Sequence, residues 1–198
     1  MAAKKLELKI IVGSTRPNRF SEKAAKWFAE IAKKRTEFNV EVLDLRDYSM
    51  PFYNEPVSPN YKKEPFTHPV VAKWTGKIAE ADGFIVVTPE YNHGYPAVLK
   101  NAIDYVGPEW RDKSISFIAY GSALGARSVE QLRQVAVELQ MVPIKNAVHI
   151  SAFWTLLDES GQLKPGAFDP YEKSAEEMIQ QLIWWGNALK AAREHSAE

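Results

Sequence analysis

The sequence predicts an α/β fold built on a parallel, doubly wound β-sheet. Segments typical of strands alternate with segments typical of helices along the chain. Residues 84–87 form a continuous apolar run, which is typical of a strand that is covered on both faces. The length of 198 residues suits one α/β domain, because domains commonly contain about 100–200 residues. We therefore predict a single domain over residues 1–198.

The first half of the chain begins with a strand, a helix and a second strand. Residues 6–12 are rich in β-forming side chains. Over 24–32 apolar residues recur at helical spacing, with an acidic residue before them and basic residues after them, which suits the helix dipole. Residues 40–45 alternate like a half-buried strand. Helical spacing returns over 70–81, ahead of the apolar run.

The second half continues the same alternation. It contains a short helical segment near 96–106 and a strand over 115–120. An apolar stripe from 129 to 139 predicts the next helix, and residues 147–150 predict a fifth strand. A last helix is expected over about 173–192. Five strands that alternate with five helices indicate one parallel sheet between two layers of helices.

The composition excludes several classes of function. The chain has no cysteine, which excludes disulfide scaffolds, thiolate metal sites and cysteine nucleophiles and favours a cytoplasmic location. Its 25 basic and 25 acidic residues balance, so there is no basic surplus for nucleic acid. The apolar run 10–12 is too short for a signal or membrane segment. His68, His149 and His195 show no metal-ligand spacing, so we predict no metal site.

Three loops that follow predicted strands share a composition rich in glycine, proline and small polar residues. The first strand is followed by GSTRPNRFS, the third by TPEYNHGYP and the fourth by YGSALGAR. In doubly wound sheets, ligands bind beyond the carboxyl ends of the strands, where the strand order reverses. The ends of the second and fifth strands look less specialised. We therefore predict one ligand that lies across the ends of strands one, three and four.

The first loop has the features of an anion site. It leads into a predicted helix N-terminus, where free backbone N–H groups and the helix dipole attract negative charge. Ser14 and Ser21 add hydroxyl donors, and Arg16 or Arg19 adds a guanidinium group. The implied ligand group is a phosphate. The alternative is that serine and glycine here only turn and cap the chain.

The second loop admits two interpretations. Glu90 and His93 could serve as general acid and base. We favour the other interpretation, in which Pro89 and Gly94 shape a tight turn whose backbone amides face a ligand, while Tyr91 offers a stacking plane. The protein side chains then bind and position, and none is assigned as a catalytic acid, base or nucleophile.

The third loop suits a flat ligand, because its glycines let the backbone approach closely. Its sequence is similar to a hydrolase nucleophile elbow, but the serine stands at the second position instead of the third, which disfavours a serine hydrolase. No Gly-x-Gly-x-x-Gly follows the first strand, so a standard dinucleotide site is also disfavoured.

Together the three loops resemble the NADPH-dependent FMN reductase family. The matching segments are GSTRPNRFS, TPEYNHGYPAVLKNAIDYV and AYGSALGARSVEQLRQV, in the right order over about residues 6–150. The resemblance implies a flavodoxin-like three-layer sandwich with five strands in the order 2-1-3-4-5. It also implies bound FMN, which takes hydride from NAD(P)H and passes electrons to free flavin, quinone or a similar small acceptor in a ping-pong cycle. Rival functions are an FMN electron carrier without NAD(P)H turnover and a regulatory domain without flavin.

The same resemblance implies the cofactor-binding residues. Those on the phosphate side are Ser14, Arg16, Arg19, Phe20 and Ser21, and those beside the ring are Pro89, Glu90, Tyr91, Asn92, His93, Gly121, Ser122, Gly125 and Ala126. Many family members have a serine three residues after the phosphate arginine, where this chain has Arg19. That departure leaves open whether Arg19, Ser21 or both contact the phosphate.

The resemblance also implies a homodimer or homotetramer. Residues 46–66 form a long connection with four prolines and interleaved aromatic residues, and loops of this length are usually functional or part of an interface. We expect residues 50–61 and 105–110 to reach a partner, because both offer aromatic side chains.

Overall fold

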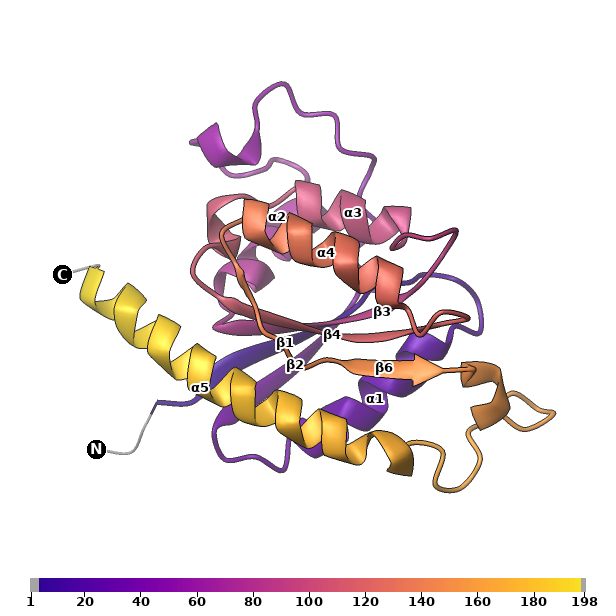
Figure 1. Cartoon of the computed structure of the whole chain (residues 1–198). Helices are drawn as coiled ribbons and strands as arrows, with labels where there is room; N and C mark the ends of the chain where they lie inside the picture. The colour runs from indigo at the N-terminus through magenta and orange to yellow at the C-terminus, as the bar shows by residue number, and fades with distance from the viewer. Residues whose placement is uncertain (1–3, 197–198) are drawn as a thin grey trace.

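The computed structural model describes residues 4–196, and its strands and helices alternate along the chain as predicted (Figure 1). The strands are β1 (Leu6–Val12), β2 (Phe38–Asp44), β3 (Gly83–Pro89), β4 (Ser114–Gly121), β5 (Val142–Pro143) and β6 (Val148–Ser151). The α-helices are α1 (Phe20–Ala32), α2 (Pro69–Ala79), α3 (Ala97–Asp104), α4 (Ala126–Glu138) and α5 (Glu172–Ser196).

The described strands form one parallel sheet in the order β2-β1-β3-β4, with β5 and β6 both paired to the far side of β4. The predicted order 2-1-3-4-5 is confirmed, with the fifth strand divided in two. Val12 pairs with Asp44 on one side and Val87 on the other, and Pro89 pairs with Tyr120. The carboxyl ends of β1, β3 and β4 therefore lie side by side.

The fifth strand breaks beyond Pro143, since the N–H groups of Val142 and Ile144 on either side of it still donate to the carbonyls of Lys113 and Ile115 at 2.9 and 3.0 Å. Pro143 has no backbone N–H to donate, which confines proline to edge strands and strand ends. Between β5 and β6 the hydroxyl of Ser116 donates to the carbonyl of Asn146 at 2.5 Å. A side chain of β4 thus donates a hydrogen bond to the edge segment at the point where regular backbone pairing is interrupted.

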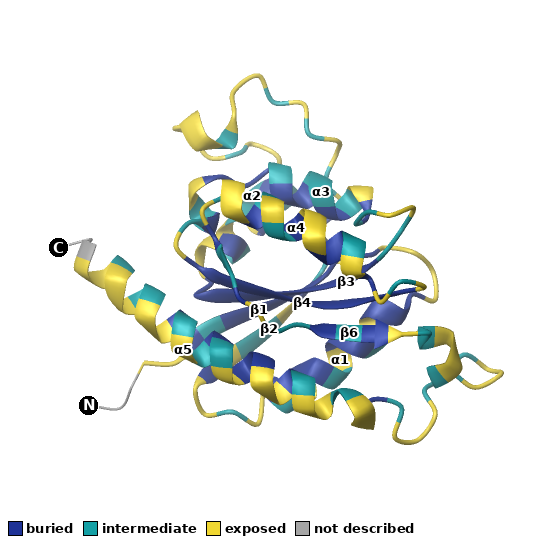
Figure 2. Ribbon diagram, viewed as in Figure 1, coloured by how far each residue is buried: buried dark blue, intermediate teal, exposed yellow. Residues whose placement is uncertain are grey.

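Helices cover both faces of the sheet, with α1 and α5 on one side and α2, α3 and α4 on the other (Figure 1). The interior is buried while the outer helix faces are exposed (Figure 2). Every residue of β3 and β4 is buried, as the apolar run in β3 predicted. Phe28 and Met178 belong to the core on the α1 side, and Trp74 and Leu132 to the core on the other side.

The two segments expected to reach a partner differ in exposure. The connection after β2 extends away from the body of the molecule (Figure 1), and Phe52 and Tyr61 are 83% and 79% exposed. In contrast, Tyr105 and Trp110 are buried in this chain's own core. The expectation that residues 105–110 offer aromatic side chains to a partner is therefore wrong, because Tyr105 packs on Tyr53 and Phe66 and Trp110 packs on Phe84.

Within residues 4–196, no helix combines the length and the apolar character that crossing a membrane requires.

Candidate functional site

The loops that follow β1, β3 and β4 meet beyond the carboxyl edge of the sheet, where they enclose a cavity of about 290 Å³. The segment after β6 closes the cavity from the side. The backbone N–H of Gly13 donates to the carbonyl of Val87 at 2.9 Å, which joins the first loop to β3. The N–H of Glu90 donates to the carbonyl of Tyr120 at 2.9 Å, which joins the second loop to β4.

The structure brings many of the predicted site residues together around this cavity. Those that line it are Arg16, Arg19, Phe20, Pro89, Glu90, Tyr91, Gly121 and Ser122. The predicted residues that do not line it are Ser14, Ser21, Asn92, His93, Gly125 and Ala126. Whether any of these residues contacts a cofactor stays a prediction.

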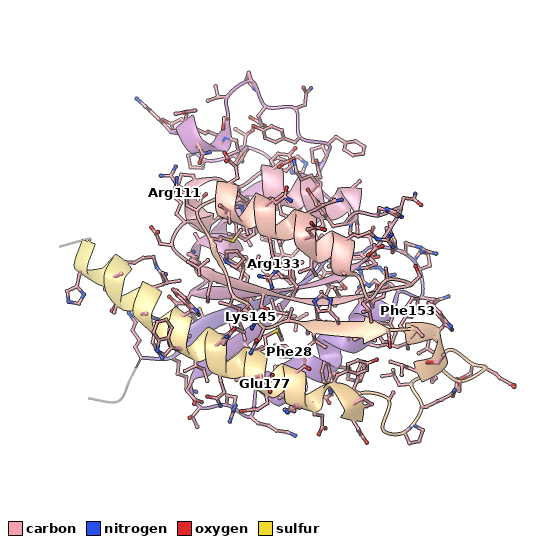
Figure 3. The ribbon with its side chains drawn as sticks, viewed as in Figure 1. Phe28, Arg111, Arg133, Lys145, Phe153 and Glu177 are labelled. Carbon is pink, nitrogen blue, oxygen red and sulfur yellow. The ribbon has the colours of Figure 1, made fainter. Side chains whose placement is uncertain are left out.

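Sequence reasoning did not single out Tyr120 and Phe153, which also line the cavity. Phe153 lies just beyond the end of β6 (Figure 3), in a region that the sequence suggested to be unspecialised. Its ring centroid is 5.1 Å from those of Phe20 and Tyr120. The signal that could have found it is the aromatic pair Phe153-Trp154 directly after a predicted strand.

Ser14 and Arg16 lie at opposite depths of the first loop. Ser14 is fully buried, and its hydroxyl is 2.9 Å from the hydroxyl of Tyr91. Arg16 is exposed, with its guanidinium carbon 5.3 Å from the centroid of the Tyr91 ring. Among the described residues, no carboxylate forms an ion pair with Arg16. Its charge is therefore available to an anion at the rim of the cavity.

Arg19 and Arg46 fix the first loop by donating hydrogen bonds to its backbone carbonyls. The buried guanidinium of Arg19 donates to the carbonyl of Ser14 and forms an ion pair with Asp44, the last residue of β2. Arg46 donates to the next two carbonyls, those of Thr15 and Arg16. The second carboxylate oxygen of Asp44 accepts from the backbone N–H of Arg46 at 2.9 Å. Three consecutive carbonyls of the loop are thus bound by two arginines that share one carboxylate.

The start of α1 leaves polar donors without partners. Arg19 precedes the first turn in an extended conformation, and no side chain caps the helix there. Among the described residues, the Ser21 hydroxyl and the Arg19 Nε are buried with no hydrogen-bond partner. A buried unpaired polar group costs about 1–3 kcal/mol, and donors at a helix N-terminus are the usual setting for a bound phosphate. The donor set therefore fits the phosphate group of FMN.

Tyr120 closes the floor of this region. Its hydroxyl accepts a hydrogen bond from the backbone N–H of Ser21 at 3.0 Å. Burial raises the pKa of Tyr120 to about 12. The side chain consequently remains a neutral phenol and adds no negative charge beside the anion site.

The second loop contains a tight hairpin turn. Tyr91 and Gly94 exchange backbone hydrogen bonds of 2.8 and 3.0 Å, and Asn92 and His93 between them have positive φ angles of 48° and 69°. Positive φ at both central residues is the geometry of a type I′ turn. The turn that we favoured is present. However, the N–H groups of Glu90 and Tyr91 are already bonded within the protein, so they are not free for a ligand.

The acidic and basic side chains of this loop are bound to α4. Arg127 contacts the buried carboxylate of Glu90 through its backbone N–H at 3.2 Å, its Nε at 2.6 Å and its Nη2 at 2.5 Å. Its Nη1 lies 2.8 Å from Nε2 of His93. Since a guanidinium only donates, the imidazole nitrogen is the acceptor in this contact. A carboxylate engaged in this way positions the loop against α4.

The third loop requires glycine at the start of α4. Gly125 has a φ of 68°, and a Cβ there would lie 2.6 Å from both the Cβ of Ala119 and the backbone nitrogen of Tyr120. A Cβ on Gly121 would lie 3.0 Å from the Cβ of Glu90. The second and third loops therefore pack closely at Gly121, and a close approach of this backbone to a flat ligand stays a prediction.

No group of three or more histidine, aspartate or glutamate side chains suited to a metal ion occurs in the part of the chain that the structure describes.

Comparison with known proteins gives a consistent family assignment. Residues 6–155 match the NADPH-dependent FMN reductase family. An NAD(P)H-dependent FMN reductase of Schizosaccharomyces pombe is 40% identical over 132 residues, which cover 67% of this chain and 66% of that protein. An NAD(P)H-dependent FMN reductase of Nectria is 32% identical over 146 residues (70% and 73%), and an NAD(P)H:quinone oxidoreductase of Solanum tuberosum is 32% identical over 136 residues (66% and 67%).

Solved structures support the same fold. FerB, a flavoenzyme NAD(P)H:(acceptor) oxidoreductase from Paracoccus denitrificans, superposes with a TM-score of 0.70 over 92% of this chain and 98% of its own, at 21% sequence identity. This likeness concerns the fold, which is the flavodoxin-like sandwich expected from the sequence. The family match covers most of the chain and all three loops around the cavity. The chain belongs to the NADPH-dependent FMN reductase family.

Proposed function

We propose that the cavity at the carboxyl edge of the sheet holds FMN, and that the chain uses it to transfer electrons from NAD(P)H to a quinone, free flavin or similar small acceptor. As a family member the chain is an oxidoreductase that depends on FMN and NAD(P)H. When bound, FMN supplies the hydride-accepting and electron-donating chemistry. The observation that carries the placement is the set of buried, unpaired donors at the start of α1 beside the cavity.

The first loop would bind the phosphate group. Ser21 offers an unpaired hydroxyl inside the first turn of α1, and Arg16 offers a free guanidinium at the rim. Arg19 would act mainly by position, since its guanidinium already binds Ser14 and Asp44 and only its Nε is left over. Because Arg19 and Arg46 already bind the carbonyls of the loop, hydrogen-bond donors remain to face the anion. A phosphate requires such donors.

The second and third loops would bind the ring system. The ion pair between Glu90 and Arg127 fixes the loop after β3 against α4. Tyr91, Gly121, Ser122 and Phe153 all line the cavity. Residues with these contacts orient a flat ligand and exclude water. None of them needs to act as a nucleophile.

The acceptor and the donor would use the same open side of the cavity in turn, which gives a ping-pong cycle. The relative from Solanum tuberosum carries the name of a quinone oxidoreductase, and this supports quinones as one acceptor class. A homodimer or homotetramer is part of the proposal, supported by the exposed Phe52 and Tyr61 of the connection after β2. So is a cytoplasmic location, since a cysteine-free chain has no disulfides to form in an oxidising compartment.

Cofactor content and turnover test the proposal together. The purified protein, incubated with FMN and desalted, is expected to be yellow and to oxidise NADPH or NADH only when a quinone or free flavin is supplied. Arg16→Ala should lose FMN on desalting, whereas Arg111→Ala, which removes an arginine remote from the cavity, should retain it. A protein that stays colourless, or a yellow protein that oxidises neither nicotinamide with any acceptor, would overturn the proposal.

A further inference from the structure

We propose that a groove beside α1 binds the adenosine half of NADPH and recognises its 2′-phosphate, so that the chain favours NADPH over NADH. The inference rests on the proposed function, because it assigns a site to the electron donor of that reaction. The groove has a volume of about 960 Å³, and it lies between α1 and residues 157–163.

The groove adjoins the cavity proposed for FMN. Asn18 and Arg19 line both spaces. The opposite walls are also continuous, because Phe153 borders the cavity and Leu157, four residues further along the chain, borders the groove. This stretch extends beyond the end of β6 (Figure 1). An elongated ligand with one end at the cavity therefore has a path between α1 and this segment.

The wall opposite α1 is an ordered turn. Leu157 and Leu163 form an antiparallel bridge, and the carboxylate of Asp158 accepts from the N–H groups of Ser160 and Gln162 at 2.9 Å each. Ser160 and Gln162 also line the groove. The side chain of Gln162 is available to the sugar of a nucleotide, while the Ser160 hydroxyl donates to Asp158 at 2.7 Å and can only accept from a ligand.

The α1 wall carries free positive charge. Lys23 and Lys26 line the groove one helical turn apart, and neither forms an ion pair with a described carboxylate. Glu22 does not neutralise them, because its carboxylate lies 3.6 Å from Arg19 and 3.7 Å from Arg46. The other acidic side chain of the lining is Glu30, a further turn along the helix. Two unpaired ammonium groups facing a concave space favour a ligand phosphate.

The floor of the groove is aromatic. Trp27 is half-buried and stacks on Phe168, with ring centroids 4.6 Å apart and planes inclined by 18°. Both rings line the groove. Flat aromatic surfaces suit the stacking of a planar base. The groove is continuous with the cavity proposed for FMN, carries two lysines free of ion pairs and has an aromatic floor. These three features together suit an elongated nucleotide that bears a phosphate. NADPH differs from NADH by one phosphate, which is the group that the lysines would recognise.

The test compares Lys23→Glu/Lys26→Glu with Lys33→Glu/Lys34→Glu, which makes the same charge change at the other end of α1 on exposed residues. In FMN-loaded protein at low ionic strength, we expect the ratio of KM for NADPH to KM for NADH to rise about tenfold in the first variant and to stay at its wild-type value in the second. Calorimetric titration supplies a readout that does not depend on turnover. Wild type should bind adenosine 2′,5′-bisphosphate at least about tenfold more tightly than adenosine 5′-monophosphate, and Lys23→Glu/Lys26→Glu should lose this difference.

Equal affinity of wild type for the two nucleotides would overturn the inference, as would a KM ratio that the first variant leaves unchanged. Displacement of the bisphosphate by equimolar inorganic phosphate would also overturn it, since that would indicate a simple anion site. Lys23→Gln/Lys26→Gln removes the charge without reversing it and provides the same comparison if the double glutamate variant does not fold. Failure of the proposed function looks different, because neither nicotinamide would then be oxidised by any of these proteins.

Discussion

The most informative single substitution is Asp44→Asn, at the end of β2. Asp44 forms the ion pair with the buried guanidinium of Arg19 and accepts from the backbone N–H of Arg46. Through these two arginines it fixes the carbonyls of the first loop. Asparagine has nearly the same shape and retains one acceptor oxygen, but it removes the negative charge that holds Arg19.

The expected loss of stability is moderate. The side chain of Arg19 is 1% exposed and that of Asp44 is 25% exposed, so the pair is shielded from water on one side only. Weakening one charge-assisted hydrogen bond in such a setting costs about 1–3 kcal/mol of unfolding free energy. A loop that loses its fixed geometry also forfeits about one hydrogen bond to the phosphate, and a loss of about 1.4 kcal/mol corresponds to a tenfold weaker FMN affinity.

Whether Asp44→Asn weakens or tightens the binding of FMN distinguishes two roles for Arg19. If Arg19 positions the loop, Asp44→Asn weakens the binding of FMN although it removes a negative charge near the phosphate. If Arg19 is the principal phosphate ligand, the same substitution frees its guanidinium and tightens binding. Fluorescence titration of the apoprotein with FMN and with riboflavin measures this, because only FMN carries the phosphate.

The matched control is Asp47→Asn, which removes an exposed carboxylate from the same segment. We expect it to leave both titrations within about twofold of wild type, as surface substitutions usually change stability by no more than about 0.5 kcal/mol. Tighter FMN binding by Asp44→Asn than by wild type would refute the positioning role. An equal loss of affinity for FMN and riboflavin would show that the loop does not act through the phosphate.

Three further substitutions probe the architecture around the site. Gly125→Ala should lower the unfolding free energy in chemical denaturation by about 1–3 kcal/mol, because the added Cβ would clash with β4. Its control is Gly76→Ala, which should be neutral or stabilising because open space surrounds Gly76. Similar unfolding free energies for the two variants would contradict the clash. Arg127→Ala should cost about 1–3 kcal/mol, since it strands the buried carboxylate of Glu90, and an unchanged denaturation midpoint would argue against that role. Burial lowers the pKa of Lys113 from 10.5 to about 8, so the folded state releases this proton at a lower pH than the unfolded state does. The stability of the wild type should therefore rise between pH 8 and 10.5 relative to that of Lys113→Met. Parallel profiles of stability against pH for the two proteins would refute this.

Much of the fold could be predicted because apolar patterning is a local signal. The run in β3 indicated burial on both faces, and the composition of the loops after β1, β3 and β4 indicated a common site at one edge. The division of the fifth strand was less visible, since the segment between its two parts is bound by a hydrogen bond from Ser116, a residue of the neighbouring strand. Contacts across strands have no counterpart in local sequence.

The role of individual site residues depends even more on distant contacts. From the sequence, Arg19 was a candidate phosphate ligand, yet its main partner, Asp44, lies 25 residues away on β2. Likewise a catalytic role for Glu90 was the less favoured of two interpretations of its loop, and its partner Arg127 on α4 could not be seen in the local sequence. The aromatic residues of 105–110 resembled an interface because sequence does not show which loops fold back onto the core. Residue types indicated the chemistry of the site, and tertiary pairing decided the part that each residue plays.

The most direct test of the central claim is an anaerobic titration of the FMN-loaded protein followed by visible absorbance. Addition of NADPH should bleach the oxidised flavin band in the protein, and subsequent addition of a quinone should restore it without further nicotinamide. A flavin band that persists with excess NADPH and NADH, or that never forms because the protein does not bind FMN, would contradict the account.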